Sequence, residues 1–485
     1  MDINNKKIKL LYWNNEISAG QKITREFNRH IILFNNINAQ IVAISKNYTG
    51  TEYPLFNADN ISSFDFDFIL CSTAEAANVN NFKIEHNLTS KKTVLLTYDL
   101  NQISSDLNID KPKKLFYETA KIEHQELISE IKVLNIVGKA DSDNQSYQNN
   151  DEQRNLVKKI IATYKLAKTD SEKVDKPYQI GENWGGYLKT TRQDFYTAIE
   201  NDDINKLQVM FGDFCRNCLS TGILGGKEAF EFFKNCIGYS RWVTHNFKVW
   251  KASLNRNEID ISELGLPEIG NPYGINIEGN IINVNSFLFH YRANFCKKIL
   301  PKDRKSVILE IGGGFGGLGH YLQKTKTNCT YIDLDIPENL VVTEYFLRSA
   351  YPNKKILSYT KDFCNGIDLS KDNLLNYDIV LLPNYMLKHF ADESIDLCIN
   401  TISLGEMGYD TICEYLKQID RKVKGYFYHE NIVNIPPYTG YPVVTYPEMK
   451  TFKEINVSTS RWSGFDAYSK EYIYTEHLLI KKLPD

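Results

Sequence analysis

Ile308-Leu309-Glu310-Ile311-Gly312-Gly313-Gly314-Phe315-Gly316-Gly317-Leu318-Gly319-His320-Tyr321-Leu322 is the stretch of sequence that decides the fold. The apolar residues at its start predict a buried parallel strand. A glycine-rich turn follows, and apolar residues at helical spacing come after the turn. A strand, a glycine turn and a helix bring backbone N–H groups close to a ligand, and glycine permits that approach. The stretch therefore predicts a site for a nucleotide-like cofactor.

The chain of 485 residues is long enough for two or three domains. Its formal net charge is −3, so no basic footprint indicates nucleic acid. No apolar stretch approaches the roughly 20 residues of a membrane span, and the N-terminus lacks the apolar region of a signal peptide. We therefore expect a cytoplasmic protein whose nine cysteines are free thiols. Cys215 and Cys218 have the spacing of half a zinc site, but no second pair accompanies them, and we expect no metal.

The first part of the chain, residues 1–138, alternates strand and helix patterns. Strands are expected at 7–13, 39–45, 66–72 and 92–98, with a helix at 21–30. This alternation predicts a small Rossmann-like or flavodoxin-like α/β domain. Its first strand is followed by residues 14–20 without a glycine fingerprint, so a role other than dinucleotide binding is expected. This domain is our candidate for self-association or for docking an enzyme of the same pathway.

The rest of the chain divides into three parts. Residues 139–155 are polar and predict a linker. Residues 156–300 are mostly helical, with a short hairpin at 275–284, and predict a substrate or cap region. Residues 301–485 contain the glycine stretch and strong α/β alternation. Helices are expected at 195–211, 228–237 and 286–300, and strands at 307–311, 330–334, 355–359, 379–382, 395–400, 425–429, 453–457 and 472–481.

The residues around the glycine stretch bear on which cofactor it binds. Gly312–Gly317 satisfies G-x-G-x-x-G, which by itself fits NAD or FAD as well. Asp333, at the end of the next strand, suits ribose hydroxyls in either class of fold. Glu310, directly before the glycines, favours a cofactor with a cationic amino-acid end, because a carboxylate repels a pyrophosphate. The residues therefore favour S-adenosylmethionine over a dinucleotide.

The chain resembles the class I S-adenosylmethionine-dependent methyltransferases, and among them the bacterial sugar O-methyltransferases of surface-polysaccharide gene clusters. The resemblance covers roughly residues 181–482 and lies in residues 270–272, 289–291, 310–318, 332–338, 382–384, 396–407 and 426–431. It implies a Rossmann-like, seven-stranded methyltransferase sheet. It also implies methyl transfer from S-adenosylmethionine to a sugar hydroxyl in capsule, O-antigen or lipooligosaccharide biosynthesis. Leu404 and Gly405 depart from the aromatic or glutamine residues that the sugar group has in this cluster.

In a doubly wound sheet the ligand lies beyond the carboxyl ends of the strands, and polar residues at these ends are the candidates. Asn384 is the candidate for the adenine contact, with Asp362 as the alternative. We expect the cofactor to contact Glu310, Gly312, Gly313, Gly314, Phe315, Gly316, Asp333, Leu334, Asn384 and Asn400.

The acceptor side is predicted from the remaining strand ends. A sugar hydroxyl needs a general base, and His429 and Glu406 are the two candidates. The acceptor is expected to contact His290, Tyr291, Ser403, Asn431 and Tyr438, the last in a Pro- and Tyr-rich segment that could stack on a sugar ring. An NAD(P)-dependent oxidoreductase or epimerase acting on sugar nucleotides is the alternative, although no Tyr-x-x-x-Lys pair follows the fourth strand.

Overall fold

A computed structural model describes residues 8–13, 39–44, 59–66, 68–71, 92–95, 151–235, 259–277, 279–366, 368–432, 449–460 and 474–482, with single positions between 82 and 88, several between 243 and 254, and residue 462. The chain forms two compact units. The first is built from residues 1–119 with 432–436 and 456–476, and the second from residues 120–431, 437–455 and 477–485. Each unit is considered separately below.

The first unit contains a four-stranded parallel sheet. Its strands are β1 (Ile8–Trp13), β2 (Ala39–Ile44), β3 (Phe68–Cys71) and β4 (Lys92–Leu95), in the order β2-β1-β3-β4. Each neighbouring pair is parallel. A short 3-10 helix, η2 (Ile61–Ser63), precedes β3. This order is the one found in flavodoxin-like sheets, and the four strands predicted for this unit are confirmed. The helix predicted at 21–30 lies outside the described residues.

The helical part of the second unit precedes the glycine stretch. Its helices are α5 (Asp151–Ser171), η5 (Lys176–Tyr178), α6 (Glu182–Thr191), α7 (Gln193–Glu200), α8 (Ile204–Gly212), η6 (Phe214–Arg216), η7 (Cys218–Ser220), α9 (Gly226–Asn235), η9 (Ile261–Leu264) and α11 (Ser286–Ile299). A hairpin of β5 (Ile275–Ile277) and β6 (Asn280–Ile282) lies before α11.

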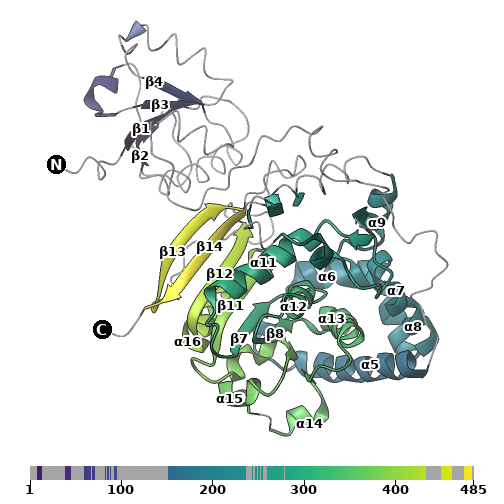
Figure 1. Ribbon diagram of the computed structural model, residues 1–485. Helices are drawn as coiled ribbons and strands as arrows, with labels where there is room; N and C mark the ends of the chain where they lie inside the picture. Colours follow the sequence, from purple (N-terminus) through teal and green to yellow (C-terminus); the bar gives the residue numbers. More distant parts are fainter. Residues whose placement is uncertain are drawn as a thin grey trace. The chain divides into compact units, whose positions relative to one another are not determined.

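An eight-stranded sheet, most of whose residues belong to the second unit, forms the centre of that unit (Figure 1). Its order is β13-β14-β12-β11-β7-β8-β10-β9. The strands are β7 (Ser306–Ile311), β8 (Cys329–Asp335), β9 (Ile356–Ser358), β10 (Ile379–Pro383), β11 (Ile395–Thr401), β12 (Val423–Ile432), β13 (Phe452–Thr459) and β14 (Tyr474–Lys481). The neighbouring pairs β12-β11, β11-β7, β7-β8, β8-β10 and β10-β9 are all parallel. The chain moves outward from β7 in one direction and then returns to its other side, which is the doubly wound arrangement.

Helices cover both faces of this sheet. On one face, the ring of Phe289 in α11 stacks on Tyr321 of α12 (Gly317–Lys324), and His320 contacts Phe346 of α13 (Pro337–Ala350). On the other face, Ile412, Leu416 and Ile419 of α16 (Tyr409–Lys422) join alternate residues of β7, together with Ile395 and Cys398 of β11, in the main hydrophobic core. Alternation of side chains along each strand thus fixes which residues reach each face.

The expected elements differ from the observed ones at three places. The helix expected at 195–211 is two helices, because Asp202 has a positive φ of 49° and Asp203 caps α8 by accepting from the Lys206 N–H. The predicted linker 139–155 overlaps the start of α5 at Asp151, so its last five positions are helical. The sheet contains eight strands, one more than the seven that the resemblance implies, and the additional strand is β9, which pairs with β10 where the residue pattern already predicts a strand at 355–359.

Candidate active site at the carboxyl edge of the sheet

The glycine stretch forms a tight loop between β7 and α12. Gly312, Gly314 and Gly316 have φ values of 77°, 65° and 84°, which side chains rarely adopt. At Gly313 the reason for glycine is steric, since a Cβ atom would lie 2.6 Å from the Asp333 carboxylate. Phe315 is buried against Phe289 and Phe346, at ring-centroid distances of 5.6 and 5.3 Å. The loop is therefore held rigidly against both α11 and α13.

Two carboxylates of β8 bind the amide groups of this loop. The Gly313 N–H donates to Asp333 Oδ1 at 3.0 Å, and the Gly314 N–H donates to Asp335 Oδ2 at 2.9 Å. The other oxygen of Asp333 is buried and has no hydrogen-bond partner among the described residues, since the nearby Thr343 hydroxyl donates to the Gly314 carbonyl. This buried acceptor would match a ligand hydroxyl.

The acidic cluster is electrostatically costly without a ligand. Burial raises the pKa of Asp333 well above its usual range, and Asp335 and Glu310 add to that shift. Burial also raises the pKa of Asp335, to about 6, against the opposing hydrogen bonds from Gly314 and Ile336. Desolvation favours the protonated forms of these buried carboxylates, although Arg192 partly opposes the shift at Asp335 and Arg292 the shift at Glu310. A ligand that brings hydroxyl donors or positive charge would relieve this cost.

Glu310 lies beneath the loop on the α11 face of the sheet. It is 2% exposed, and its Oε2 accepts from the Tyr331 hydroxyl at 2.5 Å. Burial raises its pKa to about 7, although that hydrogen bond and the Arg292 guanidinium lower it. Arg292 itself donates to Glu430 at 2.6 Å. Glu310 is therefore one of three carboxyl groups that meet where β7 and β8 end.

A turn after β11 joins the ends of three strands through side-chain amides. The Asn400 amide donates to the Ile311 carbonyl at 2.9 Å and to Ser403 Oγ at 2.6 Å. The Asn431 amide donates to Asn400 Oδ1 at 2.8 Å, and its own Oδ1 accepts from the Gly405 N–H at 2.9 Å. Asn400 and Asn431 are buried, so the structure uses both to position the turn.

Ile402, within this turn, has an unusual backbone conformation. Its φ and ψ are 74° and −48°, which is a strained region for a β-branched residue. Its N–H donates to the Glu430 carbonyl at 2.7 Å, and its side chain is 44% exposed. Strain of this kind persists only where surrounding contacts enforce it, and it is concentrated at functional sites. Here it directs the 3-10 helix η11 (Ser403–Glu406), which ends at Glu406.

Glu406 is the predicted base that the structure places in the open. Its side chain is exposed. Surrounding protein atoms nevertheless remove enough water from the carboxylate to raise its pKa to about 7, and the charge of Asp335 adds to this shift. Ser403, at the start of the same 3-10 helix, lies against the glycine loop, since a Cβ atom built at Gly312 would clash with its Oγ. Glu406 is therefore three residues from the contact between η11 and the loop. A carboxylate with this pKa is suited to accepting a proton near neutral pH.

His429, the other predicted base, is in a different environment. It is 1% exposed, and its ring stacks on His477 at 4.5 Å with the ring planes 5° apart. Burial lowers its pKa well below the usual range, and His477 adds to this shift. A ring enclosed in this way cannot meet an acceptor hydroxyl without rearrangement, so we retain Glu406 alone as the base.

His290 and Tyr291, predicted as substrate contacts, are both buried in α11. The Trp250 indole N–H donates to His290 Nδ1 at 2.9 Å. His290 Nε2 therefore carries the proton and lies 2.8 Å from Glu263 Oε2. Both ring nitrogens are occupied, which corrects the prediction that His290 binds the acceptor.

Other predicted contacts have structural partners. Asn384, at the end of β10, donates to the Tyr178 carbonyl and to the Tyr415 hydroxyl, both at 2.9 Å. Leu334 packs in the main hydrophobic core, on the face opposite Glu310. Asp362 is exposed in the first turn of α14 (Lys361–Cys364). Tyr438 lies outside the described residues. These positions give no direct support to an adenine contact by Asn384 or a cofactor contact by Leu334.

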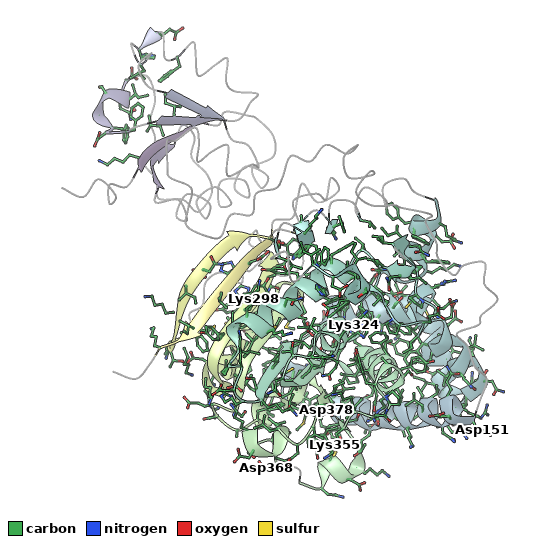
Figure 2. All side chains as sticks on the ribbon, in the orientation of Figure 1. Asp151, Lys298, Lys324, Lys355, Asp368 and Asp378 are labelled. Carbon is green, nitrogen blue, oxygen red and sulfur yellow. The ribbon has the colours of Figure 1, made fainter. Side chains whose placement is uncertain are left out.

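The predicted residues that meet at one edge are Glu310, the glycine loop, Asp333, Asn400, Ser403 and Glu406. Asp378 and Lys355, labelled in Figure 2, mark the opposite edge, where the Lys355 N–H donates to Asp378 at 2.9 Å. Among the described helices, none is long and apolar enough to cross a membrane.

Arg192 is a residue of this region that the sequence did not single out. It is fully buried at the junction of α6 and α7. Its guanidinium donates to the Glu338 and Thr221 carbonyls, both at 2.7 Å, and to Asn339 Oδ1 at 2.9 Å. Its hydrogen bonds therefore connect the helical part to the start of α13, which follows Asp335. No local motif marks such a residue, because its partners are far away in sequence.

A hollow of about 760 Å³ lies within the helical part, between α6 and α9. Both charge signs line it, with Lys206 and Asp194 paired at 3.2 Å. Thr191, Thr221 and Glu228 form part of its wall.

The cysteines at 215 and 218 are free thiols, and burial raises the pKa of both.

No protein-family profile matches the chain, and no curated protein does. Solved structures that it resembles include a TehB-like SAM-dependent methyltransferase from Corynebacterium glutamicum, with 15% identity and a TM-score of 0.27 over 39% of this chain and 86% of that one. A geranyl diphosphate methyltransferase in complex with GPP and sinefungin has 9% identity and a TM-score of 0.28 over 39% and 77%.

A third similar structure is a mitomycin 7-O-methyltransferase, with 10% identity and a TM-score of 0.27 over 41% of this chain and 55% of that one. At these scores the similarities assign neither an activity nor a substrate to this chain.

Proposed function

We propose that this protein is an S-adenosylmethionine-dependent O-methyltransferase that methylates a sugar hydroxyl. The observation that carries the proposal is the pairing of the loop amides with Asp333 and Asp335. A pyrophosphate would need free N–H donors in such a loop, and two carboxylates behind them would repel it. S-adenosylmethionine has no phosphate, and its ribose hydroxyls and positive charges suit the same carboxylates.

The residues present fit this cofactor at several points. The unpartnered Oδ2 of Asp333 would accept from a ribose hydroxyl. Burial raises the pKa of Glu310 to about 7. Beside the ammonium group of S-adenosylmethionine this carboxyl group would become fully ionised, and a contact between the two is our prediction. The bare backbone at Gly313 lets the Asp333 carboxylate lie close against the loop, where it would meet the ligand.

Bound S-adenosylmethionine would supply an electrophilic methyl group that leaves its sulfur as a neutral thioether. The protein's task is to hold an acceptor oxygen in line with that methyl group and to take its proton. Glu406 would accept the hydroxyl proton, since its pKa of about 7 matches neutral conditions. Asn400, Ser403 and Asn431 would act as positioning residues, because their hydrogen bonds fix the turn that carries Glu406.

The sugar acceptor is supported by the resemblance of residues 396–407 and 426–431 to sugar O-methyltransferases of polysaccharide pathways. The test is a methyl-transfer assay with radiolabelled S-adenosylmethionine and a panel of UDP-glucose, UDP-galactose, GDP-mannose and a lipid-linked glycan. We expect label in at least one sugar, and we expect Glu406→Gln to abolish most of it. Label transfer to none of these sugars, or NAD-dependent oxidation of one of them, would contradict the proposal.

A further inference from the structure

Helix α6 presents a pair of aromatic side chains beside the glycine loop. Trp184 and Tyr187 are one turn apart, with their ring centroids at 5.5 Å. Tyr187 is 42% exposed. Between them lie Gly185 and Gly186, and a Cβ atom built at Gly186 would meet nothing within 4 Å. Glycine inside a helix is less favourable than alanine, so the open helix surface here is retained at a cost in stability.

The position of this pair is fixed relative to the cofactor loop. The ring of Trp184 lies against Gly222, where a Cβ atom would be 2.6 Å from it. The next residue, Ile223, lies against Gly314 of the loop, at 3.5 Å from a Cβ atom built there. Arg192, at the end of α6, binds Thr221 and the start of α13 from the other side. The aromatic pair therefore contacts Gly222, whose neighbour in sequence, Ile223, contacts the glycine loop.

Packing of the backbone brings two carboxylates toward this pair. Gly226, two residues before Glu228, lies against Thr221, which adjoins the Gly222 that Trp184 contacts, and Ser403, three residues before Glu406, lies against Gly312 of the loop. Partial burial raises the pKa of Tyr187, and the charges of Glu228 and Glu406 add to that shift. Glu228 is exposed on α9 and also lines the hollow of about 760 Å³. Aromatic faces beside carboxylate acceptors are the groups that bind the apolar face and the hydroxyls of a sugar ring.

We infer that Trp184, Tyr187 and Glu228 form the acceptor subsite and that it binds a neutral pyranose. This inference rests on the proposed function, since it places the acceptor beside Glu406. A uronic acid would bring a carboxylate on the ring itself toward Glu228 and Glu406, which disfavours it. The adjoining hollow leaves space for further sugar units of a longer glycan.

The test measures binding rather than turnover. Full-length protein saturated with S-adenosylhomocysteine is titrated with the methyl glycosides of glucose, galactose and mannose and with methyl glucuronide, and binding is followed by ligand-observed NMR. We expect saturable binding of at least one neutral glycoside. Trp184→Ala and Tyr187→Ala should weaken it about tenfold, the equivalent of about 1.4 kcal/mol. The glucuronide should bind at least about tenfold more weakly than the glucoside, by the same relation.

Matched variants separate a binding role from a folding role. Phe232→Ala removes an exposed aromatic side chain of α9 that does not line the hollow, and it should leave binding unchanged. Tyr187→Phe keeps the ring and should retain most of the affinity. Equal binding by the alanine variants, equal binding of the glucuronide, or no binding of any neutral glycoside would overturn the inference. S-adenosylhomocysteine affinity, measured on the same samples, tests the proposed function separately.

Discussion

The loop between β7 and α12 and the surface facing it are assembled from different ranges of sequence. At the loop, the partners are close in the chain, because Asp333 and Asp335 follow Gly313 and Gly314 by 20 and 21 residues. On the facing surface, Tyr187 comes from α6, Glu228 from α9 and Glu406 from η11. A donor site made of one β-α-β unit is fixed by local geometry, whereas an acceptor site made of distant elements can vary independently.

The largest expected effect separates chemistry from cofactor binding. Glu406→Gln keeps the size of the side chain and removes the base, so turnover should fall by about 100-fold or more. S-adenosylhomocysteine affinity and the melting temperature should stay unchanged, since the group is exposed and lies outside the loop. Steady-state kinetics and calorimetry measure the two quantities. Glu172→Gln, another exposed carboxylate, is the control and should retain full turnover.

Glu406→Gln should also change how kcat depends on pH. Because the pKa of Glu406 is raised to about 7, the base is protonated below that pH and ionised above it. Wild-type kcat should therefore rise with pH through about 7 and level off above it. The rising limb should be absent from the residual activity of Glu406→Gln. An unchanged limb in the variant would assign it to another group and remove Glu406 from the mechanism.

The contrast between the two regions also explains what could be predicted from sequence. The strands, the glycine loop and Asp333 could be predicted, because a buried strand, a turn and a helix have local signatures. The role of Arg192 could not, because its partners at 221, 338 and 339 are brought together only by tertiary packing. Polar residues at strand ends were correctly expected to gather, but sequence did not distinguish exposed Glu406 from buried His429.

The second prediction concerns the donor side. Asp333→Ala removes both the acceptor for the Gly313 amide and the unpartnered oxygen. S-adenosylhomocysteine affinity should fall by about 10- to 100-fold, since a hydrogen bond to a charged group contributes about 1.5–3 kcal/mol. Isothermal titration calorimetry measures this change. Asp378→Ala, at the opposite edge of the sheet, is the control, and an equal loss of affinity in that variant would make the effect nonspecific.

The third prediction concerns the strained turn. Glycine adopts positive φ without strain, so Ile402→Gly should stabilise the protein by about 1 kcal/mol in urea unfolding. Turnover should fall because the turn that carries Glu406 becomes less restricted. Ile455→Gly provides the matched comparison: that side chain is 47% exposed, against 44% for Ile402, and its strand position should make glycine destabilising. Similar destabilisation of both variants would show that the turn stores no strain.

The smallest effect is the pH dependence of cofactor affinity. Asp335 and Glu310 have pKa values raised to about 6 and about 7. A cationic ligand favours their ionised forms, so binding of S-adenosylmethionine should release protons. Its affinity should therefore increase several-fold from pH 5.5 to 7.5, which is a change of about 1 kcal/mol or less. Calorimetry in buffers of different ionisation enthalpy detects the released protons, and proton uptake instead would contradict the electrostatic account.

The identity of the ligand at the glycine loop is the claim on which the rest depends. Calorimetric titration of the wild-type protein with S-adenosylhomocysteine and, separately, with NAD tests it most directly. Because Asp333 and Asp335 occupy the Gly313 and Gly314 amides, we predict saturable one-to-one binding of S-adenosylhomocysteine and no measurable binding of NAD. Saturable binding of NAD without binding of S-adenosylhomocysteine would contradict the account.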